Sequence, residues 1–132
     1  MWPFGPSQPE NLGQAGERLA GKFLRGLGYK ILARNYRCPS GEADIIALSK
    51  HSNEGPAALV FIEVKSRRTE QVVDAESAID GHKRRQLLNV ARYYLSHHRA
   101  GDMPVRFDSV AVIVPPQGEP IIRHTPDAFA AS

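Results

Sequence analysis

Two stretches of helical periodicity, separated by three β-rich segments, constrain the fold of this chain more than any other feature. In residues 12–27 the apolar side chains fall on one face of a helix, and Gly28 follows as a typical helix stop. The same period returns in residues 80–98 and ends before Gly101 and Pro104. Both helices are amphipathic, so each needs a partner that covers its apolar face.

The β-rich segments supply that partner. Three strands are expected between the helices, a strongly apolar fourth strand follows the second helix, and a short edge strand ends the series. The predicted ranges are 29–37, 42–48, 58–66, 105–114 and 120–124. The order α-β-β-β-α-β predicts an α/β fold in which helices flank a mixed sheet.

Length and composition fit one folded domain. The chain has 132 residues, of which 42% are hydrophobic and 23% are charged. We expect a single domain at residues 11–124, with flexible tails at residues 1–10 and 125–132. The net charge of +3 permits a polyanionic partner without requiring one. The lone cysteine, Cys38, excludes an intrachain disulfide, and the absence of a secretory signal or an apolar span predicts a soluble, cytoplasmic protein.

Charged residues interrupt two of the predicted strands. Asp44 precedes an apolar run in one strand, and Glu63 and Lys65 end the next. Because side chains alternate along a strand, Glu63 and Lys65 share a face, and pairing of the two strands can bring Asp44 beside Glu63. Two carboxylates at one point repel each other unless a cation lies between them, and Mg²⁺ or Mn²⁺ is the natural ion for oxygen ligands.

This arrangement suits metal-dependent phosphodiester hydrolysis. Asp44, Glu63 and the backbone carbonyl of Val64 would hold the metal, and the ammonium of Lys65 would position the attacking water. The alternative interpretation is a same-face ion pair between Glu63 and Lys65, with Asp44 as a structural acid. The pattern alone favours the two interpretations about equally.

Further polar residues surround these positions in the sequence. Glu17 falls on the rim of the apolar face of the first helix, where it suits a site or simply the helix dipole. Four basic residues that follow the site or open the second long helix are candidates for phosphate contact: Arg67, Arg68, Lys83 and Arg84. A solvated helix face explains such residues equally well. The five histidines are expected on the surface, and Asp108 is expected to be a structural hydrogen-bonding acid.

Several of these residues form linked motifs that resemble the bacterial YraN-like family. The motifs are Gly13-x-x-Gly16-Glu17, Gly28-Tyr29, Asn35-Tyr36-Arg37, Gly41-Glu42-x-Asp44-Ile45-Ile46 and Phe61-x-Glu63-Val64-Lys65-x-Arg67. That family is similar to the archaeal Holliday-junction resolvase branch of the PD-(D/E)XK nuclease superfamily. The resemblance covers residues 13–114 and implies the restriction-endonuclease-like fold.

The resemblance also implies roles for individual residues. Asp44 and Glu63 take the places of the metal-binding acids, Lys65 that of the catalytic lysine, and Glu17 that of the first-helix glutamate of resolvases. Lys83 and Gln86 lie on the helix that borders the site in related nucleases. Because resolvases of this branch act as dimers, the resemblance implies a homodimer.

The sequence thus predicts a Mg²⁺-dependent endonuclease that acts on DNA, including branched or repair intermediates. Two alternatives stay open at this stage. One is a nucleic-acid-binding module that keeps the fold and cleaves nothing. The other is a protein-interaction domain whose charges serve structure.

Overall fold

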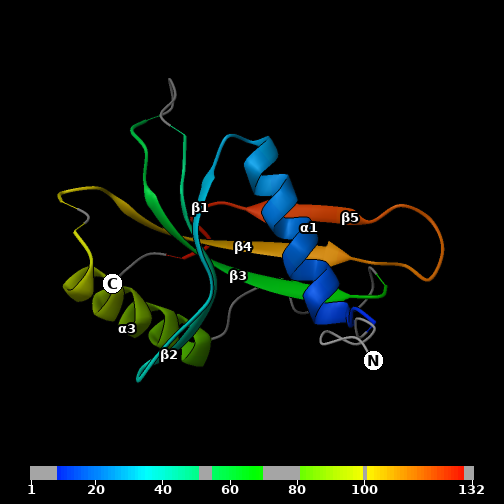
Figure 1. Ribbon diagram of the computed structural model, residues 1–132, viewed down its shortest axis with the longest axis horizontal. Coiled ribbons are helices and arrows are strands. Elements are labelled where there is room, and N and C mark those ends of the chain that lie inside the picture. The colour runs from blue at the N-terminus through cyan, green and yellow to red at the C-terminus, as the bar shows by residue number, and fades with distance from the viewer. Residues whose placement is uncertain (1–8, 51–54, 70–80, 100, 130–132) are drawn as a thin grey trace, which may run out of the picture.

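A computed structural model describes residues 9–50, 55–69, 81–99 and 101–129. Its elements are α1 (Leu12–Gly26), β1 (Lys30–Cys38), β2 (Gly41–Leu48), β3 (Leu59–Arg67), α3 (Gly81–His97), β4 (Val105–Ile113) and β5 (Ile121–Thr125), as shown in Figure 1. This order confirms the predicted α/β class and its restriction-endonuclease-like α-β-β-β-α-β core. Residues 1–8 of the expected N-terminal tail, and the expected start of the second helix at residue 80, lie outside the described residues.

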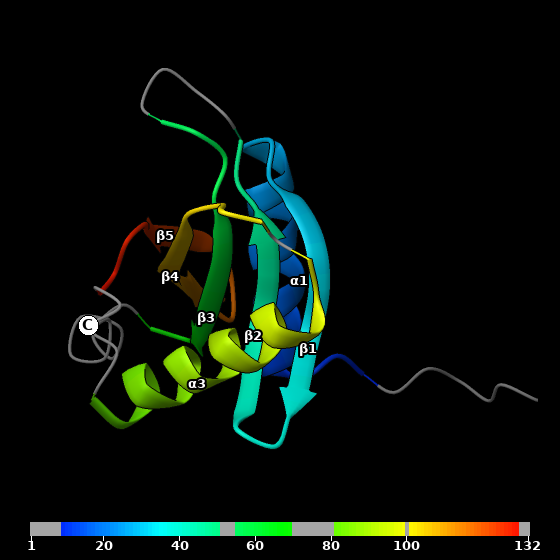
Figure 2. The same ribbon diagram turned by 90° about the vertical axis from the view of Figure 1, so that its left-hand side faces the viewer.

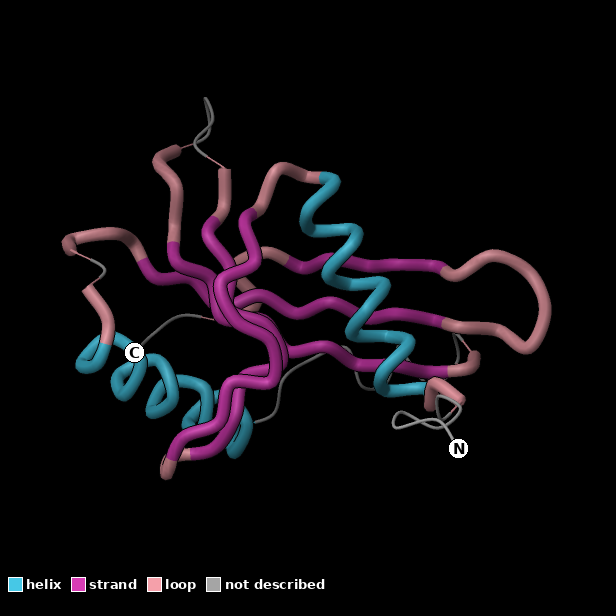
Figure 3. Tube along the Cα trace, in the orientation of Figure 1, coloured by secondary structure: helices cyan, strands magenta, loops and turns pink. Residues whose placement is uncertain are grey.

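The strands form one mixed sheet in the order β1-β2-β3-β4-β5. β3 and β4 run parallel, whereas the other neighbouring strands run antiparallel. In Figure 3 the β1–β2 hairpin crosses the direction of the other three strands steeply, so the sheet is strongly twisted. By the order of the strands, β3 is the central strand of the sheet. β2 pairs with only the first part of β3, whereas β4 pairs with β3 along its whole length.

The two helices cover opposite faces of this sheet, as Figure 2 shows. Alternation along the strands divides their apolar side chains between two cores. The core under α1 includes Ala20, Leu24, Ile45, Val60, Ile62, Val110 and Val112. The core under α3 includes Ile46, Phe61, Leu87, Val90, Tyr94 and Phe107. Each helix buries one face against the sheet, so each helix needs only one apolar face.

The first helix approaches β3 closely at its N-terminal end. Asn11 caps α1, because its side chain accepts from the Gln14 N–H while the Gln14 side chain accepts from the Asn11 N–H. One turn later Gly16 is buried against Ser66, and a Cβ built on Gly16 would lie 1.7 Å from the Ser66 Oγ. The absence of a side chain at this position therefore lets the start of α1 reach the C-terminal end of β3.

The chain continues to pack on the core beyond the expected boundary at residue 124. The Ala128 N–H donates to the Phe107 carbonyl over 2.7 Å, and the Phe129 ring stacks on the Phe107 ring with centroids 4.7 Å apart. Phe129 is only 8% exposed. Residues 125–129 of the expected flexible tail thus belong to the packed domain. No helix among the described residues is long and apolar enough to cross a membrane.

Candidate functional site

The candidate site lies where β2 separates from β3. The last paired residues of these strands are Ile45 and Ile62. Asp44 is next to this point, and its Oδ2 accepts the Val64 N–H over 2.7 Å. A carboxylate thus replaces the backbone partner that Val64 would have in a continued ladder, and the gap between the strands becomes a polar site.

The electrostatic environment of Asp44 disfavours a charged carboxylate. The pKa of Asp44 is raised to about 7, chiefly by burial. The hydrogen bond from the Val64 N–H and the charge of Lys83 lower it, whereas the neighbouring carboxylates of Glu63 and Glu17 add to the rise. The acids predicted from the sequence are therefore close enough to influence one another. A perturbed carboxyl group among like charges is typical of functional sites.

Glu63 is the most deeply buried acid of this group. It is 7% exposed, and its Oε1 lies 3.3 Å from the Nζ of Lys83 on α3. This ion pair joins β3 to α3 at the site. Burial of a carboxylate at this depth needs such a partner, or a cation in its place.

A pocket of about 410 Å³ opens beside these acids. Its walls come from the start of α1, the end of β3 and the first turn of α3. The lining residues are Leu12, Gly13, Glu17, Glu63, Val64, Lys65, Ser66, Arg67 and Lys83. Glu17 is half-buried in this wall, as its place on the rim of the helix predicted.

Four of the predicted residues are not among those that line this pocket, although one of them, Asp44, adjoins it through its hydrogen bond with Val64. Arg68 is exposed just beyond β3. The Arg84 guanidinium lies over the Phe129 ring, 5.8 Å from its centroid. Gln86 packs against the turn at Gly41, where a Cβ would come within 2.6 Å of its side chain and where the φ angle is +134°. Gln86 therefore packs α3 against the β1–β2 turn and does not line the pocket.

The donor set suits a hard divalent cation. Asp44 and Glu63 offer carboxylate oxygens, and Val64 offers a backbone carbonyl on the same strand as Glu63. Among the described residues, no three acids or histidines gather closely enough to form a complete metal cage. Mg²⁺ typically takes one or two carboxylates and fills its remaining positions with water and substrate oxygens, so an incomplete protein cage fits this ion.

The structure also contains a buried ionic cluster that sequence reasoning did not assemble. Asp108 is fully buried and accepts from the Nε and Nη2 of Arg106, both at 2.8 Å. It also pairs with His124 Nε2 at 2.7 Å and accepts the Asp127 N–H at 2.9 Å. The expectation that every histidine lies on the surface is therefore wrong for His124, whose side chain is 9% exposed.

The pKa of Asp108 shows how well this cluster is satisfied. Burial alone raises the pKa of a carboxyl group, but hydrogen bonds from Arg106, His124 and the Asp127 N–H hold the pKa of Asp108 below its usual value. The sequence signal was an acid in an apolar strand with an arginine two residues earlier, hence on the same face. The structural role expected for Asp108 agrees with these contacts.

Comparison with known proteins identifies the family. A protein from Geotalea daltonii is 38% identical over 125 residues, which cover 95% of this chain and 94% of that protein. Another from Koribacter versatilis is 48% identical over 111 residues, covering 81% of this chain and 73% of that protein. Both relatives are described as UPF0102 proteins. The profile of the uncharacterised protein family UPF0102 matches residues 16–112, and the chain belongs to that family, the YraN-like family that its motifs indicated.

Proposed function

We propose that this protein is a divalent-metal-dependent endonuclease that hydrolyses phosphodiester bonds in DNA. The observation that carries the proposal is the carboxyl group of Asp44, held on the Val64 N–H beside Glu63 with its pKa raised to about 7. Such a gathering of acids is unfavourable in the absence of a cation and becomes favourable when one is bound.

Asp44, Glu63 and the Val64 carbonyl would hold the metal. One residue in a strand directs its N–H and C=O to the same neighbour, so the Val64 carbonyl is directed toward the side on which Asp44 lies. A bound Mg²⁺ or Mn²⁺ would polarise a phosphoryl oxygen and lower the pKa of a water molecule.

Lys65 and Glu17 would act on the reacting groups from two walls of the pocket. The Lys65 ammonium would orient the attacking water and balance the charge that develops on the phosphate. Glu17, on α1, would accept a proton or hold a water molecule opposite Lys65. The two groups line the same pocket from different elements, Lys65 from β3 and Glu17 from α1.

Basic residues beside the pocket support a nucleic-acid substrate. Arg67 lines the pocket, and Arg68 is exposed beyond it. Guanidinium groups at these positions would grip backbone phosphates on one side of the scissile bond. DNA as the substrate, and a homodimer as the active form, rest on the resemblance to resolvases. Sedimentation of the pure protein tests the dimer directly.

Cleavage assays test the proposal. The purified protein is incubated with Mg²⁺ or Mn²⁺ and with duplex, single-stranded or four-way-junction DNA, in parallel with Glu63→Ala. A matched control is Glu42→Ala, because Glu42 is an exposed acid on β2 that pairs with Arg37 on the neighbouring strand. We expect cleavage by the wild type and by Glu42→Ala, and none by Glu63→Ala. Cleavage that persists in Glu63→Ala contradicts the site assignment.

The ion pair between Lys83 and Glu63 favours a second candidate, a nucleic-acid-binding module that does not cleave. An ammonium at this position can neutralise Glu63 without a metal. Salt-dependent DNA binding by the wild type and Glu63→Ala alike, without cleavage, would support this candidate. A protein that neither binds nor cleaves DNA would favour the third alternative, a protein-interaction domain.

A further inference from the structure

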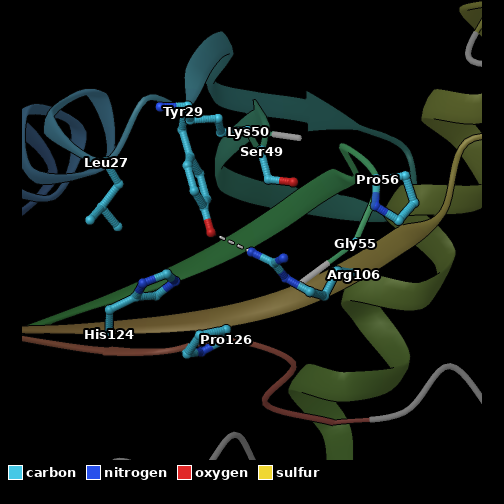
Figure 4. A pocket seen from close by; sticks show the side chains of 9 residues that line it. All are labelled: Leu27, Tyr29, Ser49, Lys50, Gly55, Pro56, Arg106, His124 and Pro126. Carbon is cyan, nitrogen blue, oxygen red and sulfur yellow. Dashed lines mark hydrogen bonds between the residues drawn. The ribbon is translucent and has the colours of Figure 1, made fainter. Parts of the chain in front are cut away.

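A second pocket lies at the opposite end of α1. It has a volume of about 400 Å³ and is lined by Leu27, Tyr29, Ser49, Lys50, Gly55, Pro56, Arg106, His124 and Pro126 (Figure 4). Along β4, Arg106 is four residues before Val110, which pairs with Val64 of the candidate active site. At a rise of about 3.3 Å per residue the two sites are about 13 Å apart along the sheet.

The Arg106 guanidinium is fixed in this pocket. Its Nε and Nη2 bind the fully buried carboxylate of Asp108, and its Nη2 also donates to the Tyr29 hydroxyl over 2.6 Å (Figure 4). Among the described residues its Nη1 makes no hydrogen bond, and a quarter of the side chain is exposed. The arginine therefore presents an oriented donor at the pocket without having to be ordered by a ligand.

A lysine and a histidine also line this pocket. The aliphatic part of Lys50 runs beside Gly28, where a Cβ would lie 2.9 Å from the Lys50 Cδ. His124 enters from β5, and its Nε2 lies 2.7 Å from the Oδ2 of Asp108. Arg106 and Lys50 together outweigh the single buried carboxylate, which leaves the pocket net positive.

The rest of the lining suits an organic group larger than an inorganic ion. Leu27, Pro56 and Pro126 add apolar surface, and the volume falls in the range typical of pockets for small organic ligands. The fixed guanidinium of Arg106, together with Lys50 and the apolar walls, suits a phosphate attached to an organic group. Arginine and lysine are the usual partners of such a phosphate.

We propose that the pocket formed by Tyr29, Lys50, Arg106 and His124 binds a phosphate monoester of the nucleotide type. The same chemistry is present in a free nucleoside monophosphate and in the phosphorylated end of a nucleic-acid strand. The proposal does not depend on the proposed nuclease activity, because it uses different residues and no metal.

The test measures binding to the full chain in the presence of a chelator. Thymidine monophosphate, thymidine, inorganic phosphate, and oligonucleotides with and without a 5′-phosphate are titrated by calorimetry and by amide chemical shifts. The variants are Lys50→Glu in the pocket, Arg92→Glu as a control of equal charge change, and Glu63→Ala in the other site. Arg92 is exposed on α3, on the opposite face of the sheet.

We expect thymidine monophosphate to bind more tightly than thymidine and to shift the amide signals of Tyr29 and Lys50. Lys50→Glu should weaken this binding about tenfold or more, whereas Arg92→Glu and Glu63→Ala should retain it. Binding confined to 5′-phosphorylated oligonucleotides, with the same dependence on Lys50, also supports the pocket and identifies a strand end as its ligand.

Three results overturn the proposal. The first is equal binding with and without the phosphate, and the second is equal binding by the wild type and Lys50→Glu. The third is loss of nucleotide binding in Glu63→Ala, which would place the phosphate in the other pocket. These binding measurements do not require catalysis. They therefore test the nucleotide pocket even if the protein does not cleave DNA.

Discussion

The carboxyl group of Asp44 lies in surroundings that disfavour its ionised form. Burial and the nearby acids Glu63 and Glu17 raise its pKa to about 7. A group whose pKa is higher in the folded than in the unfolded protein favours folding while it is protonated. Stability therefore falls as pH rises from the unfolded pKa, near 3.8, to the folded value of about 7.

Replacement of Asp44 by asparagine should stabilise the metal-free protein at pH 8. The amide oxygen can still accept the Val64 N–H, while the unfavourable charge is removed. The gain in the free energy of unfolding can reach about 4 kcal/mol if the whole pKa shift is recovered at about 1.4 kcal/mol per unit. Urea unfolding with a chelator should show this gain at pH 8 and a much smaller one at pH 4. A loss of stability at pH 8 would contradict the argument.

Metal binding should depend on the same ionisation. Below pH 7 a proton occupies the Asp44 carboxyl, so Mn²⁺ affinity should fall roughly tenfold for each pH unit below this value. Calorimetric titration with Mn²⁺ between pH 5.5 and pH 8.5 measures the effect. In Asp44→Asn both the affinity and its pH dependence should be largely lost. A pH-independent affinity in the wild type would exclude Asp44 as a ligand.

Asp108 should be among the most costly single residues to remove. Asp108→Ala leaves Arg106 and His124 without their common acceptor, and breaking a buried ion pair in this way typically costs about 3–5 kcal/mol. Because hydrogen bonds lower the pKa of Asp108, the stability it contributes is present at neutral pH and is lost as pH falls through the folded pKa. Asp102→Ala, at an exposed loop position, is the control and should change the free energy of unfolding little.

At the scale of whole elements, the contact between α1 and β3 decides where Glu17 lies. Gly16→Ala would improve helix propensity by about 1 kcal/mol. The added methyl would meet the Ser66 Oγ at 1.7 Å and the Ser66 Cβ at 2.8 Å, so rotation of the hydroxyl alone cannot relieve the clash. The start of α1 must then move away from β3 and take Glu17 with it.

Gly16→Ala should therefore reduce cleavage at least about tenfold, since displacements near 1 Å have effects of this order or larger. The double variant Gly16→Ala/Ser66→Gly should recover much of the activity, because it removes the side chain that clashes. Gly26→Ala is the matched control, since a Cβ at this position, at the far end of α1, would meet nothing within 4 Å. An active Gly16→Ala protein would show that the position of α1 does not matter for the site.

The elements themselves were predictable because their periodicity is strong. Each predicted helix and strand agrees with the structure to within a residue or two, and Asp44, Glu63 and Lys65 fall on the expected strands. The partners of charged side chains were not predictable in this way. Lys83 meets Glu63 only because α3 packs across β2, and His124 meets Asp108 only because β5 pairs with β4. Such pairs depend on distant segments, which periodicity does not place.

At the scale of the molecule, the C-terminal segment closes the core on the α3 side. The Phe129 ring stacks on the Phe107 ring, and the Arg84 guanidinium from α3 lies over the Phe129 ring. Sequence patterns near the terminus are weak, so the sequence suggested a frayed end. One aromatic ring without neighbouring apolar periodicity gives no signal of burial.

Phe129→Ala should lower the free energy of unfolding by roughly 3–5 kcal/mol, the range for removal of a buried aromatic ring. Arg84→Gln removes the cation above the ring, a contact worth about 1 kcal/mol, and leaves the Phe129 ring in place, so it should cost less than Phe129→Ala. Chemical denaturation of both variants measures the difference. Equal stability of Phe129→Ala and the wild type would mean that the segment does not pack on the core in solution.

We expect the parallel pairing of β3 with β4 to divide folding into two stages. β1, β2 and β3 are consecutive antiparallel strands, so Asp44 and Glu63 can be brought together through short loops early in the folding reaction. Partners across the parallel pair, such as Val64 and Val110, are 46 positions apart and must wait for α3 to form the crossover. The two acids should then meet before Lys83 arrives, and mutations in the β2–β3 hairpin should slow folding more than mutations in α3.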